Sequence, residues 1–192
     1  MPVAVKFHYD MATPQEQRKI RLKNDFAEMK NIKGNIVTWV GKRGSEPYIE
    51  EYELTIKIRS IVSSAPSYHN SFKMKVVLPD TYPFSAAPQI SMLSTPYPFH
   101  PNWFTSGRWC YGTWIMSESL GHHIVRMIRT LQYDADITNE HSPANSDAKE
   151  WYISKRNDGL FPCDNTVLPD PTKSKFQISG SETTTKKKFE VK

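Results

Sequence analysis

The apolar positions of the chain first follow a helical period. Thr13-Pro14-Gln15-Glu16 has the composition of a helix start, because Thr can cap, Pro fits the first helical position and Glu can close a capping box. Leu22, Phe26 and Met29 then fall on one helical face, and Gly34 ends the pattern. The sequence therefore predicts a helix that begins at the Thr13 cap and ends before Gly34.

Four segments of alternating apolar and polar residues follow. The clearest is residues 48–59, where Tyr52, Leu54 and Ile56 share one side and charged residues occupy the other. The other segments are residues 35–43, 68–78 and 88–94, and residues 63–67 have the composition of a loop. Because the connections are short, we expect a four-stranded antiparallel meander with one face that helices must cover.

Two further helical patterns come later in the chain. One follows a capping serine, Ser117 or Ser119, and repeats apolar residues over residues 120–131. An acidic loop over residues 133–141 comes next, and Ser142-Pro143 then repeats the cap-and-proline signal of a helix start. An N-terminal helix, a meander, an irregular segment and two C-terminal helices together predict a single α+β domain.

Length and charge suggest how the 192 residues are divided. We expect a lead-in over residues 1–12, a domain over residues 13–163 and a lysine-rich, flexible tail over residues 164–192. Residues 171–192 hold six lysines and two glutamates, so they account for +4 of the net charge of +5. The basic balance is therefore poor evidence for a nucleic-acid-binding face, and no nucleic-acid partner is expected.

Composition also bears on the cellular compartment. The apolar runs are too short to span a membrane, and the first residues lack the long apolar stretch of a secretory signal. Cys110 and Cys163 are too few for a disulfide framework. We therefore expect a cytoplasmic protein with reduced thiols and no membrane partner.

Residues 100–114 show neither a helical nor a strand period. This segment holds three of the five tryptophans and one of the two cysteines, and function often lies on irregular segments held by a scaffold. Gly107 permits a tight turn before Cys110, and Arg108 adds a positive charge that favours thiolate. Cys110 is therefore a candidate nucleophile, although a lone cysteine is more often a small packed residue.

Other cysteine and histidine chemistries stay open at this point. A cysteine protease needs a histidine near the sulfur of Cys110, and His100, His122, His123 and His141 offer imidazoles. A metal site from Cys110, His122, His123 and His141 would lack CxxC or HxxxH spacing. His122 and His123 point about 100° apart on a helix, so we expect one exposed and one packed histidine. With no phosphate-binding glycine motif either, neither a metal nor a cofactor is expected.

Four motifs, in this order, resemble those of the ubiquitin-conjugating enzyme family. They are the basic helix Arg18-Lys19-Ile20-Arg21-Leu22-Lys23-Asn24-Asp25-Phe26, the element Leu78-Pro79-Asp80-Thr81-Tyr82-Pro83-Phe84 with Pro88-Gln89-Ile90, the motif His100-Pro101-Asn102, and Cys110 eight residues after Asn102. A glycine also precedes Cys110 by three residues. The resemblance covers about residues 13–155 and implies a ubiquitin-conjugating-enzyme-like fold.

The resemblance implies an activity and its residues. Cys110 would accept ubiquitin or a ubiquitin-like protein as a thioester from an activating enzyme, and an amine, usually a target lysine, would then attack. Asn102 would stabilise the oxyanion or brace the loop, and His100 would give structural support. Because a thioester is already reactive, the enzyme must chiefly position and desolvate the amine and stabilise the oxyanion.

The resemblance also implies binding surfaces for partners. Arg18, Lys19, Arg21 and Lys23 would offer a basic helix to the activating enzyme, although a basic helix face is more often simply solvated. Pro83 and Phe84 would lie in the loop that meets the activating enzyme or a ligase, and the need for a ligase stays open.

The sequence departs from the family in two places. Trp114 follows Cys110 by only four residues, which shortens the segment before the next helix. The family commonly has an acidic residue that guides the incoming lysine, and the motifs do not identify its counterpart here. The candidates are Asp136, Glu140 and His141.

Two segments of the chain resemble those of a bacterial branch of the family. Tyr111-Gly112-Thr113-Trp114 and Ser142-Pro143-Ala144-Asn145 are similar to bacterial ubiquitin-conjugating-like proteins, some of which act in antiphage defence. Two other functions stay open: a non-catalytic module of the same fold that binds ubiquitin-like proteins, and a cysteine hydrolase. For Cys163, we expect a packed or surface thiol.

Overall fold

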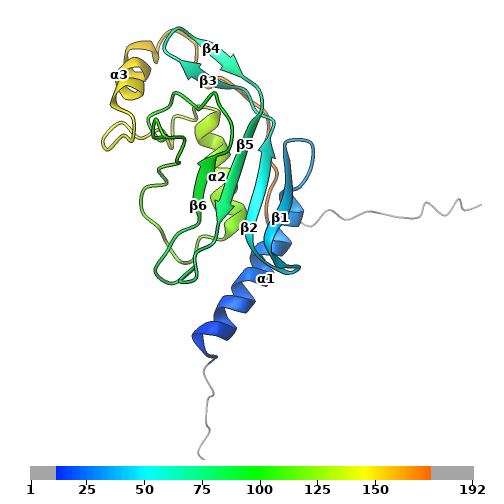
Figure 1. Ribbon diagram of the computed structural model, residues 1–192. Coiled ribbons are helices and arrows are strands. Elements are labelled where there is room, and N and C mark those ends of the chain that lie inside the picture. Colours follow the sequence, from blue (N-terminus) through cyan, green and yellow to red (C-terminus); the bar gives the residue numbers. More distant parts are fainter. Residues whose placement is uncertain (1–11, 174–192) are drawn as a thin grey trace, which may run out of the picture.

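The fold is described for residues 12–173 of a computed structural model (Figure 1). The expected lead-in therefore lies outside the described residues except for residue 12. Along the chain the elements are α1 (Pro14–Ile32), β1 (Val37–Ser45), β2 (Tyr48–Ile56), β3 (Ser60–Ser63), β4 (Ser67–His69), β5 (Phe72–Val77), β6 (Gln89–Met92), α2 (Leu120–Leu131) and α3 (Ser146–Lys155). This order confirms the expected α+β class.

The main sheet has the spatial order β1-β2-β5-β6, and all its pairs are antiparallel. Tyr52, Leu54 and Ile56 of β2 are fully buried, as the alternating pattern predicted. The apolar faces of α1 and α2 join them in one core that includes Met29 and Met127. Figure 1 shows α1 extending past one end of the sheet, with α3 at the opposite end of the molecule.

The segment between β2 and β5 was not predicted correctly. The alternation over residues 68–78 is divided, because β4 pairs with β3 in a separate hairpin while β5 pairs with β2. The strand expected to reach Arg59 ends at Ile56, and the Arg59 N–H donates to Asp164 Oδ2 (2.8 Å) rather than to a strand. Long-range contacts thus override the local alternation.

The helix starts show which local signals were sufficient. Thr13 caps α1 in a complete capping box with Glu16, as predicted. The predicted α3 start at Ser142-Pro143 is wrong, because Asn145 caps this helix and accepts a hydrogen bond from the Ala148 N–H (3.0 Å). The Ser142 N–H instead donates to Asn139 Oδ1 (2.9 Å).

The start of α2 lies at Ser119, one of the two predicted positions. Its first N–H groups are bonded to carboxylates of α1, with Leu120 N donating to Asp25 Oδ1 (2.9 Å) and Gly121 N to Glu28 Oε2 (3.1 Å). Carboxylates at a helix N-terminus satisfy unpaired donors and oppose the positive end of the helix dipole. These bonds therefore fix α2 against α1.

The chain after Cys163 continues along the folded body. Gln132 Nε2 donates to the Thr166 carbonyl (2.8 Å), and Asn31 Nδ2 donates to the Pro171 carbonyl (2.7 Å). Leu168 packs against the main core. Residues 164–173 of the expected tail therefore have packing contacts, and residues 174–192 lie outside the described residues. Among residues 12–173, no helix is both long and apolar enough to cross a membrane.

Candidate active site

The irregular segment after β6 is attached to the core by its aromatic residues. Trp103 is fully buried, and its indole N–H donates to Thr130 Oγ1 on α2 (3.0 Å). The Trp109 N–H donates to the Ile90 carbonyl of β6 (3.0 Å). Gly107 has φ +78° and accepts a hydrogen bond from the Met92 N–H (2.8 Å), so the turn before Cys110 uses the left-handed conformation that glycine allows.

Cys110 is partly exposed beside a groove of about 470 Å³. The groove lies along β6 and is lined by Gln89, Ile90, Ser91, Phe104, Arg108, Trp109, Cys110, Tyr111 and Gly112. The Cys110 N–H donates to the Asn102 carbonyl (2.8 Å). The cysteine therefore has a fixed backbone and a side chain that another molecule can approach.

His100 and Asn102 form a tight turn beneath this cysteine. The Asn102 N–H donates to His100 Nδ1 (2.9 Å), and the His100 ring lies 4.3 Å from the ring of Tyr133. Complete burial lowers the pKa of His100 to about 3, so the ring is neutral at physiological pH. A neutral, buried acceptor of a backbone hydrogen bond suits a structural role.

The Asn102 side chain contacts the acidic loop. Its Oδ1 accepts a hydrogen bond from the Asn139 N–H (2.9 Å), and the Ala144 N–H donates to the Pro101 carbonyl nearby (2.7 Å). Of the two roles expected for Asn102, loop bracing matches these contacts. The oxyanion role stays a prediction.

The three candidates for guiding a lysine do not line the Cys110 groove. Glu140 is paired with Arg156 (2.6 Å), and Asp136, whose side chain is 85% exposed, lies 3.4 Å from Arg129. The His141 N–H donates to Asn139 Oδ1 (3.1 Å). None of these contacts selects one candidate, so their role stays a prediction.

The basic side of α1 is divided between internal and exposed residues. Arg18 is paired with Glu50 (2.6 Å), and Arg21 with Asp25 (2.9 Å). Lys19 and Lys23 are exposed. The lysines are therefore the part of this basic cluster that a partner could reach directly.

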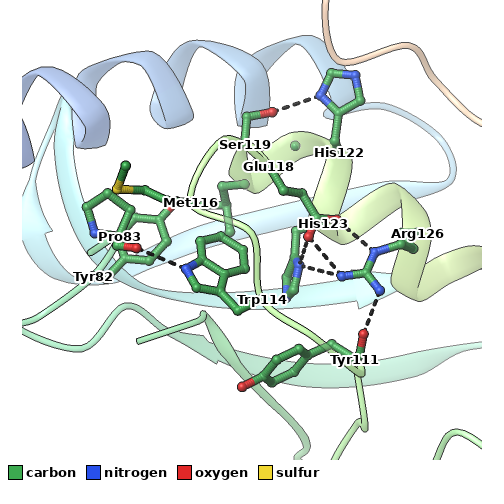
Figure 2. A network of polar contacts seen from close by, with 12 residues as sticks. Tyr82, Pro83, Tyr111, Trp114, Met116, Glu118, Ser119, His122, His123 and Arg126 are labelled. Carbon is green, nitrogen blue, oxygen red and sulfur yellow. Dashed lines mark hydrogen bonds and ion pairs between the residues drawn. The ribbon is translucent and has the colours of Figure 1, made fainter. Parts of the chain in front are cut away.

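Arg21 and the loop at Pro83 both contact the chain that follows Cys110. Arg21 Nη1 donates to the Met116 carbonyl (2.7 Å), and Nη2 to the Glu118 carbonyl. The Trp114 indole N–H donates to the carbonyl of buried Pro83 (2.9 Å), as Figure 2 shows. Phe84 beside it is 41% exposed. The regions expected to meet partners are thus attached to the chain after the cysteine.

Glu118, His123 and Arg126 form a polar cluster that was not predicted from the sequence (Figure 2). Glu118 Oε1 accepts from Arg126 Nε (2.7 Å), and its Oε2 lies 3.1 Å from His123 Nδ1. Burial would raise the pKa of Glu118, but hydrogen bonds from His123 and Arg126 hold it at about 2. His123 is fully buried and the His122 side chain 51% exposed, which confirms one packed and one exposed histidine.

The histidine contacts also bear on the alternatives. His100, His122 and His123 form their hydrogen bonds with Asn102, Ser119 and Glu118. Within residues 12–173, no histidine is hydrogen-bonded to the Cys110 sulfur, so the cysteine–histidine pair of a hydrolase is not formed there. No group of three or more His, Cys, Asp or Glu side chains in this part of the chain could hold a metal ion.

Cys163 lies in a different environment. It is 1% exposed, and its Sγ donates to the carbonyls of Arg59 (3.3 Å) and Leu131 (3.4 Å). Burial raises the pKa of Cys163 to about 12. A protonated, hydrogen-bonded thiol is inert, so this cysteine matches the expected packed residue.

Comparisons with known proteins add little to this geometry. No protein-family model matches the chain, and no curated protein matches it. Among solved structures, it is similar to human ubiquitin-conjugating enzyme E2 G1, with a TM-score of 0.46 and 17% sequence identity. The likeness covers 63% of this chain and 98% of that chain. Because the score and the identity are both low, this likeness carries no argument about activity.

Proposed function

We propose that this protein is a ubiquitin-conjugating-type acyl transferase with Cys110 as the carrier. The Cys110 thiolate attacks the thioester that joins ubiquitin or a ubiquitin-like protein to its activating enzyme. A C–S bond forms at Cys110, the old C–S bond breaks, and the activating enzyme's thiolate leaves. A neutral amine, usually a target lysine, then attacks, so that a C–N bond forms, the new C–S bond breaks, the sulfur takes the electron pair and the amine releases a proton.

One observation carries this proposal: a partly exposed cysteine beside a groove has its backbone bonded to the turn that holds His100 and Asn102. A thioester carrier needs an accessible sulfur and a fixed backbone more than it needs a base, because its acyl group is already activated. The absence of a histidine bond to the sulfur within residues 12–173 fits this chemistry better than a hydrolase.

The surrounding residues take roles in the same proposal. Asn102 supports the loop at Asn139 or donates to the oxyanion, and His100 supports the turn. Asp136, Glu140 and His141 stay the candidates for guiding the lysine.

The partners in this proposal are an activating enzyme, a ubiquitin-like protein and a target lysine, with a ligase left open. On the basic helix for the activating enzyme, Lys19 and Lys23 are exposed, while Arg18 and Arg21 are paired with carboxylates. In the loop for the activating enzyme or a ligase, Phe84 is exposed beside buried Pro83. We further propose a cytoplasmic role in a bacterial conjugation system, with antiphage defence as the setting.

The test is adduct formation on non-reducing gels with ATP. Two probes are tested: any activating enzyme and ubiquitin-like protein that prove to be encoded beside the gene, and human ubiquitin with its own activating enzyme. We expect an adduct that reducing agent removes, a reductant-resistant ester or no adduct for Cys110→Ser, and no adduct for Cys110→Ala. Cys163→Ala is the matched control and should load normally.

Two outcomes contradict the proposal. An adduct that survives Cys110→Ala and disappears with Cys163→Ala would show that Cys163, not Cys110, is the carrier. No adduct with either probe, together with measurable noncovalent binding, would favour the non-catalytic binding module.

A further inference from the structure

The backbone around Cys110 is held by three different parts of the fold. The Trp109 N–H donates to β6 (3.0 Å), and the Cys110 N–H donates to the Asn102 carbonyl (2.8 Å). The next residue, Tyr111, is held through its carbonyl, which accepts a hydrogen bond from Arg126 Nη1 on α2 (2.7 Å). The backbone is thus held on both sides of Cys110. After the cysteine, at Tyr111, the hydrogen bond comes from the Arg126 side chain.

The chain becomes open directly after Tyr111. Gly112 is exposed, has φ +77°, and an added Cβ there would meet no atom within 4 Å. Thr113 is exposed as well, and the next attachment is the bond from Trp114 to the Pro83 carbonyl. The Arg126 bond therefore precedes an exposed glycine that can rotate with little steric restraint.

Arg126 is itself held in one orientation. Its Nε and Nη2 donate to the two oxygens of Glu118 (2.7 and 2.8 Å), and its guanidinium lies 5.2 Å from the Trp109 ring. A guanidinium that binds a carboxylate with two nitrogens has a fixed plane. Its remaining nitrogen is therefore directed at the Tyr111 carbonyl, as Figure 2 shows.

The buried ring of His123 completes the support. It lies 4.9 Å from the Trp109 ring, 5.7 Å from the Tyr111 ring and 5.3 Å from the Trp114 ring. Both sequence neighbours of Cys110 thus rest on the same imidazole. Glu118 connects this ring to Arg126, so the cluster contacts both the backbone and the side chains around the cysteine.

We propose that Arg126, oriented by Glu118, is a positioning residue for aminolysis of the Cys110 thioester. This inference rests on the proposed function. In that step the amine nitrogen forms the C–N bond, the C–S bond to Cys110 breaks, the sulfur takes the electron pair and the amine gives its proton to solvent. Arg126 touches none of these atoms and acts by holding Tyr111, and thereby the carrier sulfur, in the orientation that the amine must meet.

The magnitude follows from the sensitivity of transfer reactions to geometry. Misplacement of reacting atoms by about 1 Å costs about a hundredfold in rate. Loss of one backbone contact next to Cys110, while the contacts of Trp109 and Cys110 remain, leads us to expect about a tenfold loss for Arg126→Ala. The apparent KM for the amine should stay the same, because Arg126 does not line the groove beside the sulfur.

The experiment measures single-turnover discharge of preformed thioester to increasing concentrations of free lysine. The preformed thioester removes the activating enzyme from the measured step. Arg43→Ala is the matched control, since Arg43 also pairs with a carboxylate, Glu50 (3.1 Å), and donates to a backbone carbonyl, that of Leu78 (3.4 Å). Arg43 lies on β1, at the sheet edge opposite β6. The Arg43→Ala variant should therefore discharge its thioester at the wild-type rate.

Three further variants separate positioning from general destabilisation. Arg126→Lys keeps the charge but loses the two-nitrogen fork, so it should restore only part of the rate. Glu118→Gln should slow discharge, and its effect should be smaller in an Arg126→Ala background than in the wild type, because Glu118 acts on Tyr111 largely through Arg126. If Arg126→Ala does not fold by circular dichroism, Glu118→Gln and Arg126→Lys carry the test.

The outcomes distinguish this inference from the proposed function. A wild-type protein that never loads on Cys110 overturns both. A wild-type protein that loads and discharges, with an Arg126→Ala variant of equal rate, overturns the positioning role alone. A fall in rate shared by Arg43→Ala, a changed KM with an unchanged maximal rate, or independent effects of Glu118 and Arg126 would also overturn it.

Discussion

Asp25 is the buried carboxylate on which α1, α2 and the loop at Tyr82 converge. It is 1% exposed, and its oxygens accept hydrogen bonds from the Tyr82 hydroxyl (2.6 Å), the Leu120 N–H (2.9 Å) and Arg21 Nε (2.9 Å). Replacement of Asp25 by Ala would leave these donors without their acceptor. Because Arg21 also donates to Met116, the loss extends to the chain after Cys110.

The expected cost follows from the donors left behind. Each buried donor without a partner costs about 1–3 kcal/mol, and the Leu120 N–H also loses its helix cap, which is worth about 1 kcal/mol. Arg21 can recover part of its loss through water, since its side chain is 15% exposed. We therefore expect Asp25→Ala to lower the free energy of unfolding by about 3–5 kcal/mol, in the range for breaking a buried ion pair.

The assay is equilibrium urea unfolding followed by circular dichroism. The midpoint should fall with an unchanged slope, and Asp25→Asn, which keeps one oxygen acceptor, should lie between Asp25→Ala and the wild type. Asp158→Ala is the control, because it removes an exposed pair with Lys155 (2.9 Å) and should change the free energy by less than about 0.5 kcal/mol. A loss below about 1 kcal/mol for Asp25→Ala would refute this reasoning.

Three further outcomes are expected. Gly107→Ala should lower the free energy of unfolding by about 1–2 kcal/mol in urea, because φ is +78° and the new Cβ would lie 3.0 Å from the Met92 Cβ. Asn102→Ala should slow thioester discharge about tenfold while loading persists, since Asn139 loses its acceptor. Burial lowers the pKa of His100 from 6.5 to about 3. The unfolded state therefore binds this proton more readily, so protonation of His100 lowers the free energy of unfolding as the pH falls below 6.5. His100→Asn should reduce by about 2 kcal/mol the fall in the free energy of unfolding, measured in urea, between pH 7 and 5.

Local signals predicted the helices well and the sheet partly. The Thr13 capping box uses contacts within one turn, so its residues alone were sufficient to predict it. The β3–β4 hairpin depends on which short segments pair, and residues 68–78 alternate in the same way whether they pair with β2 or with β3. The start of α3 was predicted at Ser142-Pro143, whereas Asn145 caps this helix and the Ser142 N–H is bonded to Asn139.

The candidate site was predictable where its residues are adjacent in sequence. The family resemblance implied that His100 and Asn102 support the loop beside Cys110, and the structure joins these residues by hydrogen bonds. The cluster at Arg126 was not predicted, because its essential contact is with a backbone carbonyl of a segment that has no period. Glu118, five residues before His123, was the available signal for an acid–histidine contact.

The imidazole of His123 has an optical consequence. Trp109 and Trp114 lie edge-on to this one ring, and Tyr111 lies tilted against it. Aromatic side chains held in a fixed asymmetric arrangement give near-ultraviolet circular dichroism, and they lose it when packing becomes fluid. The rings around Cys110 therefore contribute to the near-ultraviolet signal of the protein, together with other packed pairs such as Trp39–Tyr52.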